Sequence, residues 1–144
     1  MDGILAADLA QEVPLHAAKG LLGVPRTLLL KVNAGHPALS DPRARQALSM
    51  AIDREGLAEA ILRFPAGGTQ LFPPSLGEWH AEGVAPLAYN PEKARALLAE
   101  LVWQPGPGGI LTRNGERFSP TLTIFPDRLE LPLSAAVLQQ MASA

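Results

Sequence analysis

The sequence contains no cysteine. A disulfide framework, a thiolate nucleophile and a cysteine-based zinc site are therefore excluded. Histidine is also scarce, and His16, His36 and His80 are spaced too widely to form a helix-borne pair of metal ligands. We therefore predict that the protein has neither a metal site nor a resident cofactor.

The chain also lacks an excess of positive charge and a long apolar run. Lys and Arg together number 12 and Asp and Glu 14, so the formal net charge is −2. Without a basic surface, nucleic acid is not an expected partner. No apolar run reaches the roughly 18 residues that a membrane-spanning helix needs. The first residues, MDGIL, lack the basic region and cleavage site of a signal peptide, so we expect any export signal to lie outside this chain.

What the sequence does contain indicates one folded segment of 144 residues. Hydrophobic residues make up 47% and charged residues 18%, a balance that favours a packed core over disorder. The chain has 14 prolines and 13 glycines, which are densest at 64–86 and 104–120, and we interpret these segments as surface connections. In particular, 69–87 is predicted to be an ordered loop whose apolar side chains dock on the domain.

Helices are predicted where a capping residue precedes an apolar stripe. Asp41 with Pro42 begins a helix over 41–52, and Asp53 begins a second helix that ends near residue 62. Asn90 with Pro91 begins a third helix over 90–101. The stripe of the first helix consists of Ala44, Ala47, Leu48, Ala51 and Ile52.

Two further helices are less sharply bounded by the sequence. A short helix is predicted over 13–19, with Gly20 as its stop. A final helix begins at Leu131 or Pro132 and places Leu133, Val137 and Met141 on one face. It runs to the end of the chain without a stop signal.

Strands are predicted over 3–6, over 26–33 (RTLLLKVN) and over 121–125 (TLTIF), since these runs are apolar or β-branched. Asn114 and Gly115 tolerate positive φ and predict a hairpin over 110–118. The fold class is therefore α/β (α+β), a mixed sheet with about five flanking helices. Two long strands are few for a sheet of typically ~5, so we expect the chain to be part of a larger fold.

Four motifs in this order resemble the bacterial solute-binding proteins of family 5, which serve ABC transporters. Residues 33–57 read NAGHPALSDPRARQALSMAIDREGL and are similar to a family helix ending in Ala-Ile-Asp-Arg. Residues 69–75 (TQLFPPS) resemble its double-proline loop, and 89–98 (YNPEKARALL) its next helix. In the family, this helix is followed by a turn and a strand, and the hairpin over 110–118 followed by TLTIF has the same order. One departure is Val102, because the family has a glycine before the tryptophan, where a left-handed helix end favours glycine.

The resemblance implies a two-lobe clamp of the type II periplasmic-binding-protein fold. Residues 1–144 would form a single segment belonging to one lobe, which lacks most groups that hold a ligand in the family. We therefore expect the segment alone to bind the native solute weakly or not at all. The unpaired edge of its sheet predicts a dimer through that edge.

Candidate site residues are few. Asn33 ends the predicted central strand, where open α/β sheets place ligands, while Trp79 and His80 lie in the proline-rich loop. Instead of contacting a ligand, Asn33 and His80 could form local hydrogen bonds, and Trp79 could be a packing residue. Asp41 and Asp53 are better explained as helix caps than as acid–base groups, and no serine lies in a G-x-S-x-G elbow. We predict no catalytic residue.

Arginines 43, 45 and 54 could hold a carboxylate through their forked donors, but the expected role is structural pairing with nearby Asp or Glu. The resemblance implies a non-enzymatic substrate-binding component that captures a peptide, a nickel complex or a similar solute. Its partner would be an ABC permease in the membrane, and its location periplasmic or at the cell surface. The alternative is the ligand-sensing domain of a transcription regulator with a similar fold. A small hydrolase is a further alternative, but it would need a nucleophile–base pair, and the three dispersed histidines argue against one.

Overall fold

The computed structural model describes residues 27–63, 67–125, 127–128 and 130–143. The strand predicted over 3–6 and the helix predicted over 13–19 lie outside these residues. The chain divides into two compact units. We call Met1–Leu29 with Arg54–Pro86 the loop unit, and Leu30–Asp53 with Leu87–Ala144 the hairpin unit.

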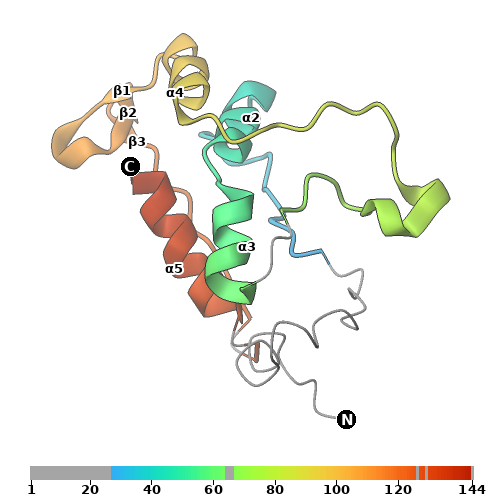
Figure 1. Ribbon diagram of the computed structural model, residues 1–144. Helices are drawn as coiled ribbons and strands as arrows, with labels where there is room; N and C mark the ends of the chain where they lie inside the picture. The colour runs from blue at the N-terminus through green and yellow to red at the C-terminus, as the bar shows by residue number, and fades with distance from the viewer. Residues whose placement is uncertain (1–26, 64–66, 126, 129, 144) are drawn as a thin grey trace. The chain divides into compact units, whose positions relative to one another are not determined.

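Two helices, α2 (Pro42–Met50) and α4 (Pro91–Glu100), pack against each other in the hairpin unit (Figure 1). Both predicted caps are confirmed. The Asp41 side chain accepts the backbone N–H of Arg43 at 2.8 Å, and the Asn90 side chain accepts that of Lys93 at 2.8 Å. Each cap satisfies a donor that the first helical turn leaves without an intrahelical partner.

Small side chains allow these two helices to approach closely. Ala47, Met50 and Ala94 are buried together, and Ala47 is completely inaccessible to solvent. The stripe predicted for α2 therefore does face the core, although its last member is Met50 instead of Ile52, which stays partly exposed. A backbone hydrogen bond of 2.8 Å from Asn90 to Met50 joins the end of α2 to the start of α4.

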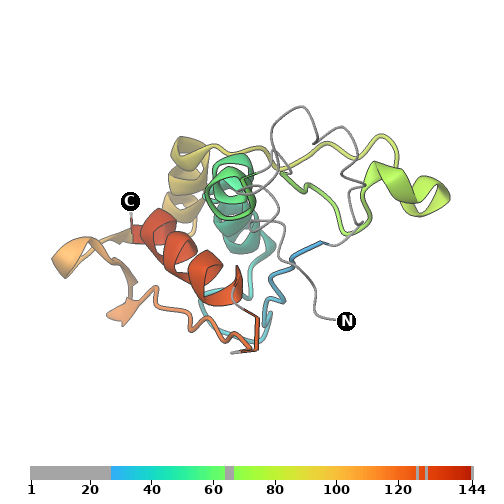
Figure 2. The same cartoon turned by 60° about the horizontal axis from the view of Figure 1, so that its bottom comes forward.

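A three-stranded antiparallel sheet follows α4 (Figure 2). Its strands are β1 (Gln104–Pro105), β2 (Leu111–Arg113) and β3 (Glu116–Arg117), paired in that order. The predicted hairpin is confirmed, because Asn114 and Gly115 both have positive φ and join β2 to β3. Strand β1 was not predicted, because it is only two residues long.

The connection between β1 and β2 is a tight turn that contains a short 3-10 helix, η3 (Pro107–Gly109). The Gly106 N–H donates to the Ile110 carbonyl at 2.9 Å. A Cβ on Gly106 would lie 2.8 Å from that same carbonyl oxygen and 2.5 Å from the Thr112 side chain. Only glycine fits at this position, so Gly106 serves the turn, in agreement with the surface connection predicted over 104–120.

Helix α4 ends in a Schellman motif despite the absence of glycine. The Trp103 N–H donates to the Leu98 carbonyl at 3.0 Å and the Val102 N–H to the Ala99 carbonyl at 2.9 Å. Val102 adopts φ 64°, in the left-handed region. The departure from the family pattern therefore leaves the turn intact but places a β-branched residue in a strained conformation.

Three expectations about the sheet were wrong for the described residues. Neither 27–33 nor 121–125 forms a strand, and the described sheet is antiparallel instead of mixed. A sheet pairing is a property of two segments, and neither apolar run has a ladder partner within the described chain. The predicted final helix is present as α5 (Glu130–Ser143), which begins one residue before Leu131; it buries Ser134, whereas Leu133 is 58% exposed.

The loop unit contains helix α3 (Arg54–Leu62), which begins directly after Asp53, as predicted. Among the side chains of α3 that the structure describes, Ala58 is buried. The chain then returns to the start of α3, where Gly67 lies so close that an added Cβ would meet the Glu55 side chain at 2.7 Å. Among the described residues, no helix has the length and apolar character to cross a bilayer.

Candidate functional site

The loop that follows α3 is closed at its neck by side-chain hydrogen bonds. The Gln70 amide donates to the Ala81 carbonyl at 3.0 Å, and the His80 Nδ1 lies 2.8 Å from the Phe72 carbonyl. Thr27 donates to the Leu71 carbonyl at 3.0 Å on the outer side of the neck. We call residues 70–82 the 70–82 loop, and its ordered form agrees with the prediction for 69–87.

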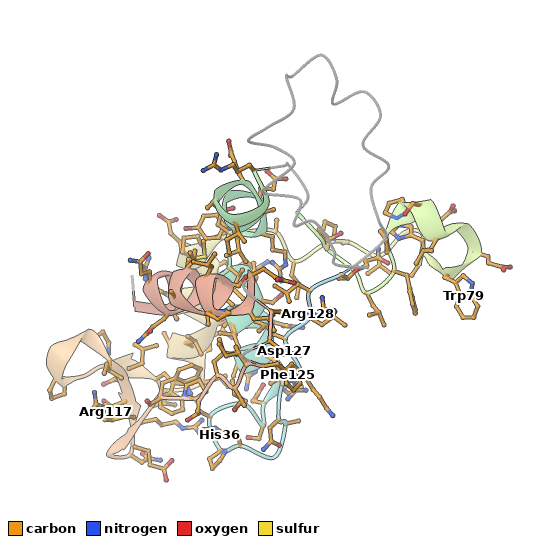
Figure 3. The ribbon with its side chains drawn as sticks, turned by 90° about the horizontal axis from the view of Figure 1, so that it is seen from below. His36, Trp79, Arg117, Phe125, Asp127 and Arg128 are labelled. Atoms are coloured by element: carbon orange, nitrogen blue, oxygen red, sulfur yellow. The ribbon has the colours of Figure 1, made fainter. Side chains whose placement is uncertain are left out.

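The tip of this loop is the short 3-10 helix η2 (Pro74–Trp79), which is bent at Gly77. Pro73, at φ −68° and ψ 161°, enters it in the extended conformation that a double proline favours. Figure 3 shows Trp79 at the outer end of the loop.

The expectation that apolar groups of the loop dock on the domain was wrong. Leu71 is 51% exposed and Trp79 is 66% exposed. The Phe72 and Trp79 rings contact only each other among aromatic groups of the described chain, with centroids 5.9 Å apart. The pair is therefore an aromatic surface directed to solvent.

Two of the three predicted site residues lie together in this loop. His80 fixes the neck and Trp79 lies beside it at the tip. Asn33 belongs to the hairpin unit, where its side-chain oxygen accepts the Gly35 N–H at 2.9 Å and its carbonyl accepts the His36 N–H at 3.1 Å. Asn33 thus organises a turn, and its predicted ligand contact stays a prediction.

The remaining polar candidates have structural partners. Arg43 pairs with Asp41 at 2.9 Å, and Arg45 donates at 2.8 Å to the Leu39 and Ser40 carbonyls. The hydrogen bond from the Arg43 side chain, followed by that from its backbone N–H, lowers the pKa of Asp41 below its ordinary value. This carboxylate therefore stays ionised and is unsuited to proton transfer near pH 7.

The described histidines likewise serve the backbone. His36 Nδ1 accepts the Ala38 N–H at 3.2 Å, and His80 contacts the Phe72 carbonyl as described above. Within 27–63, 67–125, 127–128 and 130–143, no three His, Asp or Glu residues come together in a way that could hold a metal ion.

A set of contacts that the sequence did not indicate surrounds Trp103. Arg113 lies 4.4 Å over the Trp103 ring and donates to the Pro37 carbonyl at 3.3 Å, while Phe118 meets the ring edge-on at 5.1 Å. The Trp103 side chain is 98% buried, and its Nε1–H has no hydrogen-bond partner in the described chain. No spacing in the sequence could have brought Pro37 and Arg113 together.

Comparison with protein families decides the relationship. The model of the bacterial extracellular solute-binding proteins, family 5 Middle, matches residues 5–144. The chain belongs to this family. The resemblance inferred from the ordered motifs is therefore confirmed over almost the whole sequence.

Curated relatives of this family 5 chain are named as binding proteins. The probable di/tripeptide-binding protein 5 of Pseudomonas aeruginosa is 34% identical over 95 residues, covering 61% of this chain and 18% of that protein. The oligopeptide-binding protein AppA of Bacillus subtilis is 35% identical over 94 residues, with 62% and 17% covered. The glutathione-binding protein GsiB of Salmonella typhimurium is 32% identical over 78 residues, with 54% and 15% covered.

The family 5 chain thus matches less than a fifth of the length of these relatives. No solved structure is significantly similar to it.

Proposed function

We propose that this family 5 chain is part of the substrate-binding component of an ABC importer, which captures a peptide or peptide-like solute outside the membrane. The family match over 5–144 carries the proposal. The names of the relatives support peptides as the solute class, since they specify di- and tripeptides, oligopeptides and glutathione. Binding without chemical change needs no catalytic residue, and we propose that the chain has none.

We further propose that the chain contributes to one lobe of a type II periplasmic-binding-protein fold. The helices and the small antiparallel sheet are compatible with such a lobe. The exposed runs 28–30 and 121–125 support this reading, because Leu28, Leu29 and Phe125 are more than half exposed and suit strands that pair with further segments.

Partners and location follow from the same proposal. The family name describes extracellular proteins, which supports a periplasmic or cell-surface location and an ABC permease as the membrane partner. A nickel complex as cargo and a dimer through an exposed sheet edge stay predictions. The alternative of a regulator's sensing domain has no supporting observation, since the relatives named above are all binding proteins.

Calorimetry on the polypeptide encoded by the complete gene tests the proposal. We expect saturable binding of a tripeptide, an oligopeptide or glutathione, with Ni²⁺ titrated in parallel. Release of a covalently changed product would contradict it, and so would the absence of binding to any of these solutes. The 144-residue chain titrated in the same way is expected to bind far more weakly, because a clamp needs both lobes.

A further inference from the structure

We propose that Asn114 is a site of spontaneous covalent modification, at which the Asn-Gly turn converts to isoaspartate at a rate that the opening of the hairpin controls. The inference does not depend on the proposed function, because it concerns the chemistry of the turn itself.

The reaction needs only the turn and water, and asparagine is among the thermolabile residues. The backbone nitrogen of Gly115 attacks Cγ of Asn114 and closes a five-membered succinimide ring. The former side-chain nitrogen leaves as ammonia, which takes up the proton of the Gly115 nitrogen. Water then opens the ring. Addition at Cγ gives aspartate, whereas addition at the main-chain carbonyl carbon gives isoaspartate, in which the chain continues through Cβ and Cγ.

Of the three asparagines in the chain, only Asn114 is followed by glycine. The residue after Asn33 is an alanine, whose Cβ hinders attack, and the residue after Asn90 is a proline, which has no N–H. The side-chain oxygens of Asn33 and Asn90 also accept backbone N–H groups at 2.9 Å and 2.8 Å. At Gly115, by contrast, even an added Cβ would meet nothing within 4 Å. Asn114 and Gly115 are both exposed, so water reaches the ring.

The closed turn opposes formation of the ring. Asn114 has φ 53° and Gly115 has φ 81°, and Arg113 pairs with Glu116, so the two-residue loop is a type I′ turn. The first residue of such a turn has ψ of about +30°, which places the Gly115 nitrogen on the opposite side of the Cα–C bond from Cβ. A five-membered ring needs both atoms on the same side. The hairpin therefore has to open before Asn114 reacts.

Few contacts limit this opening, and Arg113 supplies one of them. The strands share only four paired positions. Arg113 directly precedes Asn114 and lies 4.4 Å over the ring of the buried Trp103. Because chemical modification of an opened segment follows the population of its open form, loss of the Arg113 contact should accelerate the reaction at Asn114.

The product no longer fits the turn. Isoaspartate lengthens the main chain between Arg113 and Glu116 by one atom and adds a carboxylate beside Glu116. A type I′ connection requires two ordinary residues, so the modified hairpin pairs less well and holds Arg113 less firmly over Trp103. The modification is thus an irreversible loosening of this part of the hairpin unit.

Incubation of the 144-residue chain near pH 7, followed by peptide mapping, tests the inference. A glutamate-specific protease releases peptide 101–116, whose isoaspartate form is identified by its mass and by coelution with a synthetic standard. We expect isoaspartate at Asn114 and none at Asn33 or Asn90 over the same period. The chain unfolded in urea should convert about 10- to 100-fold faster than the folded chain. Asn114→Gly accepts the same φ and should give no product.

Variants connect the rate to the hairpin. Arg113→Ala should raise the rate at Asn114 in the folded chain by about fivefold or more. Arg117→Ala, at an exposed position of β3, is the matched control and should change the rate little. The ratio of folded to unfolded rates is compared in each case, because the rate in urea corrects for any direct effect of the neighbouring side chain. The purified isoaspartate form should unfold at lower urea than Asn114→Asp, which adds the same charge without the extra main-chain atom.

Each result decides the inference. A folded chain without isoaspartate after about ten half-lives of the unfolded chain would overturn the assignment of the site. Equal rates in the folded and the unfolded chain, or equal effects of Arg113→Ala and Arg117→Ala, would overturn control by the hairpin. Equal urea midpoints for the isoaspartate form and Asn114→Asp would overturn the loosening.

Discussion

The guanidinium of Arg113 lies 4.4 Å above the centre of the Trp103 ring and ties two distant parts of the hairpin unit together. Trp103 follows α4, whereas Arg113 ends β2 and also reaches the Pro37 carbonyl. Arg113 thus helps, together with Phe118, to anchor the hairpin to the core beside the helical pair. The strands themselves contribute only four paired positions, so we expect this anchor to matter for local stability.

Arg113→Ala should lower the free energy of unfolding by about 1–2 kcal/mol, since it removes a partly buried cation–π contact and a charged hydrogen bond. Urea unfolding followed by Trp103 near-UV circular dichroism measures the effect. Arg117→Ala, at an exposed position of β3, is the matched control and should change the midpoint little. Equal effects of the two substitutions would refute the anchoring role.

Val102→Gly should stabilise the protein by about 1 kcal/mol, because glycine adopts the left-handed conformation without strain, and this relief outweighs the larger backbone freedom that glycine loses on folding. The Val102 side chain is 61% exposed, so little burial is lost. Thermal unfolding checks the prediction. Val84→Gly, at an exposed valine without positive φ, should not stabilise; a lower melting temperature for Val102→Gly would contradict the strain argument.

Asp41→Asn should show how much the charge of Asp41 contributes to the free energy of unfolding as the pH changes. The asparagine side chain can still cap the helix. The pKa of Asp41 lies below its ordinary 3.8 in the folded protein, mainly through the Arg43 side-chain hydrogen bond. The ionised group therefore stabilises the fold above pH 3.8, and this contribution is lost as the pH falls through the folded pKa. The stability difference between wild type and variant should shrink in that window.

Urea titrations from pH 7 down to pH 3 measure the difference for Asp41→Asn, with Asp127→Asn at an exposed turn as the control. A difference that stays constant to pH 3 would show that Asp41 gains nothing from its charge.

Gly106→Ala should destabilise the hairpin unit by about 1–3 kcal/mol, as overpacking does in a close contact. The new methyl group would meet the Ile110 carbonyl, a backbone atom that cannot rotate away. Gly106→Ala/Thr112→Ala relieves the side-chain clash but not the backbone clash. Full recovery of the urea midpoint in the double variant would show that only Thr112 matters.

Local signals in the sequence predicted the elements whose causes are local. Asp41 and Asn90 cap helices because a side-chain oxygen meets an amide two or three residues along the chain. Asn114-Gly115 makes a hairpin because both residues accept positive φ. The family could likewise be inferred from the sequence, since four motifs in the family's order can be recognised without knowledge of their contacts.

Strand assignments failed for a different reason. The runs 27–33 and 121–125 have the composition of strands, but a strand requires a partner, and none is present in the described chain. In the same way, Trp79 looked like a packing anchor because aromatic residues usually are, whereas only the fold leaves it 66% exposed.

The sequence by itself determined the capped helices, the Asn-Gly hairpin and membership of the solute-binding family, because each depends on neighbours along the chain or on their order. The tertiary structure alone decided that Arg113 covers Trp103, that Val102 bears strain and that the Phe72–Trp79 pair faces solvent. Those features depend on contacts between segments far apart in sequence, or on burial, and neither composition nor spacing encodes which distant surfaces meet.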